Sequence, residues 1–217
     1  MSTPQRILAL DAAYGAAAAC LLLPDKKPLL AVTDQATPHS RSIIPMLHGQ
    51  LEKAGVDWQQ LDMLAVGAGP GSFTGLRVAA ATISGLNASL GLPVMPVSSL
   101  AITALQADTP EKIWVIEDAR SGDAYVGCYK QGEPLQADQC LPWEEVVRLP
   151  AANFVGLTEP AADLAGWQKM EASRCRAEAL AELIILQAER GDLASLPRRA
   201  MPVYMQPSQA ERKAAGG

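Results

Sequence analysis

Short apolar blocks separated by turn-forming residues open the chain and predict three strands. The blocks cover residues 7–10, 16–23 and 29–33, and the turns between them contain Gly15 and a polar loop at 24–28 that begins and ends with proline. Such short connections join antiparallel neighbours, because parallel strands need a longer crossover. The start of the chain therefore predicts an antiparallel meander.

The pattern then changes to the three- and four-residue spacing of helices. After Ser40, apolar residues recur in this spacing as far as Leu51, and Gly55 ends the run. The next elements expected are a strand over 63–67, a helix over 73–90, a strand over 94–97 and a short helix from Ser98 or Ser99. A meander followed by parallel crossovers is typical of the ribonuclease-H/actin-like fold, whereas a plain doubly wound sheet alternates strands and helices from its start.

The second half of the chain begins again with a strand, residues 113–117, which ends at Asp118 as the first strand ends at Asp11. The elements expected after it are a hairpin of 124–130 with 135–140, a short helix over 142–149, a strand over 154–157 and an amphipathic helix over 177–189. The predicted fold class is α/β, with two actin-like, ribonuclease-H-like lobes, each a mixed sheet flanked by helices. We assign residues 1–105 to the N-terminal lobe and 106–217 to the C-terminal lobe, with a frayed polar tail from residue 206.

Composition and charge exclude several classes of function. The 217 residues carry a formal net charge of −5, which gives no general attraction to a phosphate backbone, so binding of nucleic acid would need a partner. The four cysteines are scattered without a CxxC pair, which favours a reducing compartment over a disulfide framework or a zinc site. No signal-peptide pattern is present and the longest apolar run is too short to span a bilayer, so we expect a cytoplasmic protein without a membrane role.

The densest cluster of unusual residues is the segment 66–77, Val-Gly-Ala-Gly-Pro-Gly-Ser-Phe-Thr-Gly-Leu-Arg. It lacks the Gly-Lys-Ser/Thr of a P-loop, and Ser72 stands where a dinucleotide-binding loop needs its third glycine. A sharp turn, a helix cap and outward-pointing backbone N–H groups remain as its physical properties. A purely structural turn is one interpretation, but the density of glycine, hydroxyl and arginine favours a binding surface, made of Gly69, Pro70, Gly71, Ser72, Phe73, Thr74, Gly75 and Arg77.

The helix that follows carries small residues four apart, Ala81, Gly85 and Ser89. Such a stripe lets another backbone approach closely. The stripe either packs on the protein's own sheet or forms an interface with another subunit.

Candidate catalytic groups are few. Asp11 and Asp118 each end a predicted strand, where actin-like ATPases place the carboxylates that hold metal and water, although a turn or cap role is the other interpretation. His39 and His48 are too far apart for two ligands on one helix face, so no metal site is expected. A peptidase is not supported, because no nucleophile–base or metal motif is recognisable.

These motifs resemble the signature of the TsaB (YeaZ) family. The glycine-rich segment carries the resemblance, and three further segments agree with it in order: His39-Ser-Arg41, Asp118-Ala-Arg-Ser-Gly-Asp-Ala-Tyr125 and Pro202-Val-Tyr204. The resemblance implies two lobes of the ASKHA type and no complete active site. It also implies a scaffold role for the N-terminal lobe, with the catalytic subunit TsaD and the ATPase TsaE as partners and a homodimer when the protein is alone.

The resemblance further implies that the complex transfers a threonylcarbamoyl group to N6 of adenosine 37 in tRNAs that read ANN codons, with tRNA bound only through the complex. No intrinsic cofactor is expected, and ATP or ADP would be held, if at all, at the interface with TsaD. Where the family usually has hydroxyl residues after the first strand, this chain has Ala12-Ala13-Tyr14, which argues against ATP hydrolysis by the chain alone. The alternative is an ATPase or small-molecule kinase that uses Asp11 and Asp118 with Mg²⁺. We expect Asp11, Asp118 and Arg120 to be remnants of a nucleotide site or to brace the two lobes. For Arg120, contact with a partner is the other interpretation.

Overall fold

The computed structural model describes residues 6–34, 36–191 and 195–206 and contains two five-stranded sheets. The first sheet has the order β3-β2-β1-β4-β5. Its strands are β1 (Ile7–Asp11), β2 (Ala18–Leu22), β3 (Leu29–Val32), β4 (Met63–Gly69) and β5 (Val94–Ser98). The β1–β2 and β2–β3 pairs are antiparallel, while β4 is parallel to both β1 and β5. The predicted meander with parallel crossovers is confirmed.

The second sheet repeats this topology. Its order, β10-β9-β6-β7-β8, corresponds to that of the first sheet read in the reverse direction. Strands β6, β7 and β8 form an antiparallel meander, β9 is parallel to β6, and β10 is parallel to β9. The strands are β6 (Lys112–Arg120), β7 (Asp123–Lys130), β8 (Glu133–Pro142), β9 (Asn153–Val155) and β10 (Gln168–Lys169). The duplicated α/β architecture predicted from the sequence is therefore confirmed, although β10 was not expected.

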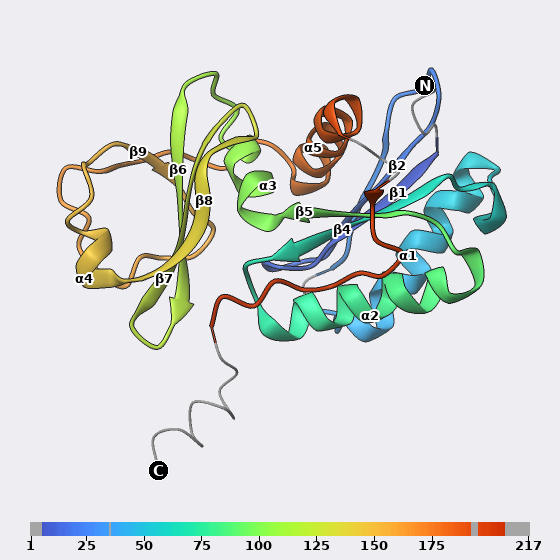
Figure 1. The fold of residues 1–217 in the computed structure, drawn as a ribbon, viewed down its shortest axis with the longest axis horizontal. Coiled ribbons are helices and arrows are strands. Elements are labelled where there is room, and N and C mark those ends of the chain that lie inside the picture. The colour runs from blue at the N-terminus through green and yellow to red at the C-terminus, as the bar shows by residue number, and fades with distance from the viewer. Residues whose placement is uncertain (1–5, 35, 192–194, 207–217) are drawn as a thin grey trace, which may run out of the picture.

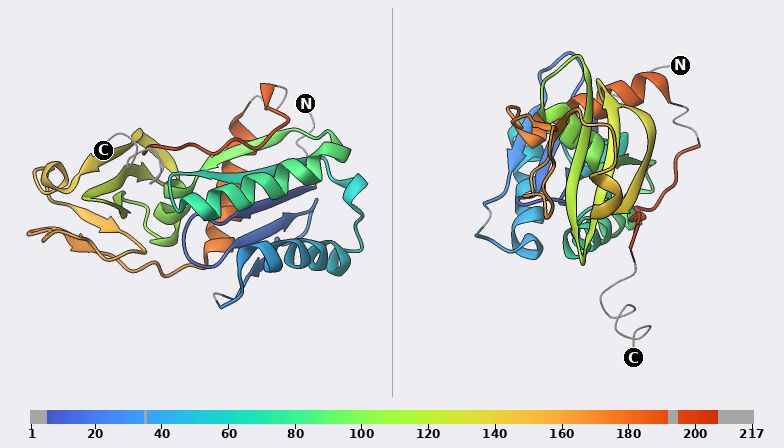
Figure 2. Two further views of the ribbon diagram at one scale, coloured as in Figure 1. Left: turned by 90° about the horizontal axis from the view of Figure 1, so that it is seen from below. Right: turned by 90° about the vertical axis from the view of Figure 1, so that its left-hand side faces the viewer.

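Two long helices lie side by side on one face of the first sheet (Figure 2, left). They are α1 (His39–Ala54) and α2 (Phe73–Leu90), and a short 3₁₀ turn, η1 (Trp58–Gln60), follows α1. Ser72 caps α2 by accepting a hydrogen bond from the Gly75 N–H, and left-handed glycines at positions 55 and 91 end the two helices. The core beneath them consists of apolar side chains from the strands, including Leu8, Leu10 and Leu64.

The opposite face of the first sheet is covered by α3 (Ser99–Gln106) and α5 (Arg176–Arg190), and a second core joins these helices to β6 and β7 of the second sheet. Figure 1 shows α3 between the two sheets and α5 above the first. A smaller cluster around Trp114 and Trp143 fills the outer face of the second sheet under α4 (Trp143–Val146).

The division of the chain at residue 105 therefore separates the two sheets but not the helices. Helix α5 comes from the second half of the sequence, yet it packs on β1, β2 and β3 of the first sheet. Residues 197–206, which we call the C-terminal strap, also return to the first lobe and run along α2 (Figures 1 and 2). The physical reason is that the apolar face of α5 is buried against the face of the first sheet that α1 and α2 do not cover. The predicted frayed tail lies, from residue 207, outside the described residues.

A partly buried polar cluster also connects the two sheets. Ser98, at the end of β5, donates a hydrogen bond of 2.6 Å to the Asp138 carboxylate on β8, and the Tyr129 hydroxyl on β7 donates to the same carboxylate. Burial raises the pKa of Asp138, and the two hydroxyls act in the opposite direction. No helix among the described residues has both the length and the apolar character needed to cross a bilayer.

Candidate functional site

The glycine-rich segment folds as predicted into the end of β4, a turn and the start of α2, and its glycines serve close packing. A Cβ on Gly67 would lie 1.8 Å from the Asp11 carboxylate, and one on Gly75 would lie 2.0 Å from the backbone oxygen of Ala12. Ser72 donates its N–H to the Ala13 oxygen at 2.9 Å, which ties the turn to the connection after β1. Only residues without a side chain allow this approach of backbone to backbone.

This packing corrects part of the predicted binding surface. Gly69, Pro70 and Gly75 are buried, so these residues shape the turn and do not themselves present a surface, whereas the partly buried Gly71 lines the cleft described below. The members of the predicted surface that are exposed lie on the cap and first turn of α2: Ser72, Phe73, Thr74 and Arg77.

The small-residue stripe faces solvent. Ala81, Gly85 and Ser89 are all exposed, and a Cβ on Gly85 would meet no atom within 4 Å. Packing against the protein's own sheet, one of the two interpretations of the stripe, is therefore wrong; the buried face of α2 is formed by other residues, among them Leu76, Ala79 and Ile83. The stripe continues the row of Phe73 and Arg77 at steps of four residues, so a single exposed ridge runs along the helix.

Asp11 is fully buried and forms an ion pair with Arg176 of α5. The Arg176 Nε donates to one carboxylate oxygen at 2.7 Å, and the Ser99 hydroxyl donates to the other at 2.7 Å. The remaining guanidinium nitrogens donate to Thr103, Gln106 and the Ser99 carbonyl, so Arg176 is held by four acceptors. Both oxygens of Asp11 are thus engaged by groups of the protein itself.

Tyr14 completes this cluster. The Arg176 guanidinium lies 5.3 Å from the centroid of the Tyr14 ring, a cation–π contact. Burial raises the pKa of Tyr14, and its hydroxyl has no hydrogen-bond partner among the described residues. Sequence reasoning did not single out Arg176, although one signal existed: the residue lies one helical step of four before Leu180, on the apolar face of α5.

Asp118 and Arg120 do not brace the lobes. Strand β6 continues through Asp118 to Arg120, and the Arg120 side chain is 80% exposed and pairs at 3.5 Å with Asp118 of the same strand. The expected brace is therefore wrong for Arg120, because a tight turn with positive φ at Arg120 directs the chain back into β7. The neighbouring Glu117 is buried and accepts hydrogen bonds from the backbone and hydroxyl of Thr158; burial nevertheless raises its pKa.

A cleft of about 770 Å³ brings the predicted site residues from both halves together. Its lining includes Ser72 to Thr74 of the glycine turn, Asp118 and Arg120 of β6, and the strap residues from Val203 to Gln206, but not Asp11. The strap forms one wall, since the Val203 N–H donates to the Ala68 carbonyl at 2.7 Å and the Gln206 amide donates to Asp123 at 2.6 Å.

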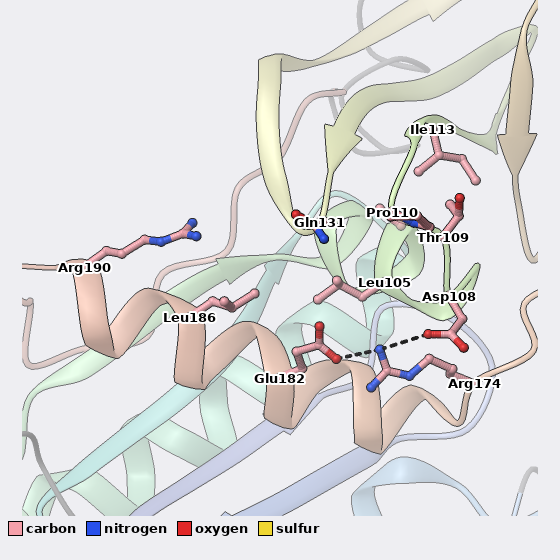
Figure 3. A pocket seen from close by; sticks show the side chains of 11 residues that line it. Leu105, Asp108, Thr109, Pro110, Ile113, Gln131, Arg174, Glu182, Leu186 and Arg190 are labelled. Carbon is pink, nitrogen blue, oxygen red and sulfur yellow. Dashed lines mark ion pairs between the residues drawn. The ribbon is translucent and has the colours of Figure 1, made fainter.

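A second, smaller pocket of about 380 Å³ lies away from these residues, between α3, α5 and the turn after β7 (Figure 3). Its apolar wall contains Leu105 and Leu186, and Arg174 spans its floor between Asp108 at 3.7 Å and Glu182 at 2.5 Å. Because Arg174 is neutralised on both sides, this pocket offers no unpaired charge to a ligand at that point.

The residues present do not fit a magnesium–nucleotide site of the actin-like kind. A carboxylate that holds hydrated Mg²⁺ must turn its oxygens to solvent or phosphate, whereas those of Asp11 are bonded to Arg176 and Ser99. Among the described residues no group of three or more His, Cys, Asp or Glu is arranged to hold a metal ion.

Comparison with known proteins places the chain in a family. The family model described as "TsaD: tRNA N6-adenosine threonylcarbamoyltransferase" matches residues 33–163. The tRNA threonylcarbamoyladenosine biosynthesis protein TsaB of Haemophilus influenzae is 34% identical over 146 residues, which are 65% of this chain and 61% of that protein. TsaB of Bacillus subtilis is 32% identical over 142 residues, which are 65% of this chain and 62% of that protein. The match thus spans less than two thirds of the length of either relative.

A solved structure extends the similarity to nearly the whole chain. YeaZ from Pseudomonas aeruginosa superposes with a TM-score of 0.73 at 32% sequence identity, covering 92% of this chain and 99% of that chain. Coverage of 92% of this chain means that the similarity extends over both lobes. The chain therefore belongs to the TsaB (YeaZ) family.

Proposed function

We propose that the protein is a non-catalytic subunit of the machinery that makes threonylcarbamoyladenosine in tRNA. In this role it binds and activates a TsaD-type catalytic subunit in the cytoplasm, and that subunit transfers the threonylcarbamoyl group to N6 of adenosine 37 in tRNAs that read ANN codons. The names of the relatives support the pathway, and the TsaD family model supports a shared ancestry with the catalytic subunit.

The observation that carries the non-catalytic assignment is the engagement of Asp11. An actin-like ATPase or kinase that used this carboxylate with Mg²⁺ would need it open to the ligand. Here the carboxylate is fully buried and pairs with Arg176, and the guanidinium occupies the charge-neutralising role that a metal ion would have. Asp118 stands apart from it, paired with Arg120. The kinase alternative therefore lacks Asp11, one of the two carboxylates on which it depended.

The docking surface in this proposal is the exposed ridge of α2 with its cap. It consists of Ser72, Phe73, Thr74, Arg77, Ala81, Gly85 and Ser89. The small side chains in its middle allow a partner helix to approach closely, so that no cavity is left between the two helices when the ridge is buried. A second copy of the chain can use the same ridge, which supports a homodimer in the absence of the catalytic subunit.

The net charge of −5 supports contact with tRNA through the complex and not by this chain alone. Recruitment of a TsaE-type ATPase and the retention of ATP or ADP at the interface with the catalytic subunit remain predictions that follow from family membership. Neither requires a nucleotide site within this chain.

Co-expression with the TsaD homologue of the same organism tests the proposal. Size-exclusion chromatography should give a joint peak, and an assay for modified tRNA should require both proteins. Gly85→Trp should weaken the joint peak while the monomer stays folded, because the added side chain projects into solvent. Leu135→Trp, at an exposed position on β8 of the other lobe, is the matched control and should leave the joint peak unchanged. If Gly85→Trp binds as the wild type does, the ridge is not part of the interface. If calorimetry shows ATP binding by the wild type that is lost in Asp11→Ala, the kinase alternative is favoured instead.

A further inference from the structure

The C-terminal strap is a part of the molecule that the proposed docking surface does not yet use. It is held by backbone groups along its length: the Pro197 carbonyl accepts from the Val94 N–H at 2.7 Å, the Arg198 carbonyl accepts from Asn87 at 2.8 Å, and the Val203 N–H donates to Ala68. Figure 2 (left) shows the strap along the side of α2 that faces away from α1. The strap is therefore fixed to α2 as a neighbouring strip of the same face.

While its backbone is bound, the strap leaves large apolar side chains in solvent. Met201 is 72% exposed, Val203 48% and Tyr204 45%, and Phe73 beside them on α2 is 38% exposed. The Phe73 and Tyr204 rings are in contact, with centroids 5.2 Å apart. Large exposed apolar side chains on one strap, with two of the rings in contact, indicate an interaction site.

Arg77 lies beside Phe73 and Tyr204 and is oriented by them. Its guanidinium carbon lies 4.0 Å from the centroid of the Phe73 ring, and its Nε donates to the Tyr204 hydroxyl at 3.4 Å. Within the described part of the chain, no carboxylate pairs with Arg77. The remaining N–H donors of the guanidinium are left for a partner, and two parallel donors match a carboxylate.

We propose that Met201, Val203 and Tyr204 of the strap, together with Phe73 and Arg77, extend the α2 docking surface. The occupant is the TsaD-type catalytic subunit, which meets Arg77 with a carboxylate. This inference rests on the proposed function, which supplies the partner. It adds the strap residues to the surface that the partner contacts.

The composition of the patch favours a protein over RNA. Tyrosine, phenylalanine, methionine and arginine are the residues enriched in the cores of protein interfaces and among their energetically dominant contacts. Arg77 is the cation among the five residues of the patch, the exposed Arg198 and Arg199 lie at the beginning of the strap, and the net charge of −5 gives the chain no general attraction to a phosphate backbone. Tyr204 contributes its exposed ring to the surface and also accepts a hydrogen bond that orients Arg77.

Affinity measurements with the purified TsaD homologue test this assignment on the full-length chain. Arg77→Ala and Tyr204→Ala should each weaken binding by about tenfold or more, the range typical of central tyrosine and arginine contacts. Tyr204→Phe retains the ring that packs on Phe73 and should stay within about threefold, since it loses one neutral hydrogen bond. Leu135→Ala, exposed on the other lobe, should stay within about twofold, the ordinary result for a residue outside an interface. Circular dichroism should give the same spectrum for all four variants and the wild type.

The salt dependence of binding provides a further readout, which would not change if Arg77 had a purely structural role. Raising the ionic strength should weaken wild-type binding more than that of Arg77→Ala, because only the wild type has the ion pair to be screened. Failure of wild-type chain to bind would contradict the proposed function. Wild-type binding with Arg77→Ala and Tyr204→Ala unchanged would leave that function intact and overturn the strap inference. Dissociation of a homodimer by these variants without loss of catalytic-subunit binding would also overturn it, since the occupant would then be a second copy.

Discussion

The ion pair between Asp11 and Arg176 should be a major stabilising contact of the first lobe, and Arg176→Met tests this. The substitution keeps the apolar length of the side chain and removes the guanidinium. It leaves the Asp11 carboxylate fully buried, with the Ser99 hydroxyl at 2.7 Å and the Ala13 N–H at 3.4 Å as its remaining partners. One hydroxyl and one long backbone contact are poor compensation for a buried charge.

The expected cost follows from that geometry. Removing one partner of a buried pair costs about 3–5 kcal/mol, because the other charge remains without compensation. A domain of this kind has a total unfolding free energy of about 5–15 kcal/mol, so the loss would be a large fraction of it. The same substitution at Arg190, a half-exposed arginine in the last turn of α5 that pairs with Glu133, should cost at most about 1 kcal/mol.

Urea unfolding followed by circular dichroism measures these differences, with the slope checked so that a change in midpoint reports a change in free energy. Asp11→Asn combined with Arg176→Met removes the unpaired charge and should be at least about 1 kcal/mol more stable than the sum of the two single effects predicts. A cost below about 1 kcal/mol for Arg176→Met, equal to that of Arg190→Met, would refute the argument that the buried pair is a major stabilising contact of the first lobe.

Three further predictions use other features of the structure. Gly75→Ala places a Cβ 2.0 Å from a backbone oxygen and should destabilise by about 3 kcal/mol, whereas Gly85→Ala meets no atom and should stabilise α2 by about 0.5–1 kcal/mol; thermal melts compare them. Because the pKa of Asp138 is raised in the folded chain, the folded chain binds more protons than the unfolded chain from pH about 4 upward through the raised pKa. The unfolding free energy therefore falls as pH rises through this range. Asp138→Asn should flatten this fall in urea titrations at several pH values. Cys175 is exposed and should supply the fastest thiol reaction with a disulfide reagent, a phase that Cys175→Ser removes.

The sequence was sufficient for the architecture because local patterns determine it. The apolar runs that became β1 to β5, the helical spacing of α1 and α2, and the glycines at positions 55 and 91 all act over a few residues. Strand β10, with only two residues, has too little pattern to be recognised. The return of α5 to the first sheet depends on which apolar surface remains uncovered, and no local signal specifies that.

The site was only partly predictable for the same reason. The glycine turn was found, yet its glycines were assigned to a surface, because the contact between Gly75 and Ala12 joins segments that spacing alone does not relate. Arg176 pairs with a carboxylate 165 positions away, and the strap reaches α2 from the C-terminal end. Long-range partners of this kind are fixed by tertiary packing. The sequence also left two interpretations of the small-residue stripe open, and the structure decided between them by showing that Gly85 is exposed.

The buried pair and the exposed ridge together explain how an ATPase-like framework can serve as a binding subunit. In this fold the carboxyl end of β1 lies beside the N-terminus of α2, a position suited to hold a ligand between the lobes. Here that position is stabilised from within by Arg176, so the chain needs no ligand to complete its core. The exposed face of α2 is then available for contact with a partner. Its middle carries residues small enough for a helix to approach, and its N-terminal end carries Arg77, which lies beside two aromatic rings. In the proposed function, one side of α2 supplies stability and the other recognition. Gly75 and Gly85, ten residues apart on the same helix, should therefore respond in opposite directions to substitution by alanine.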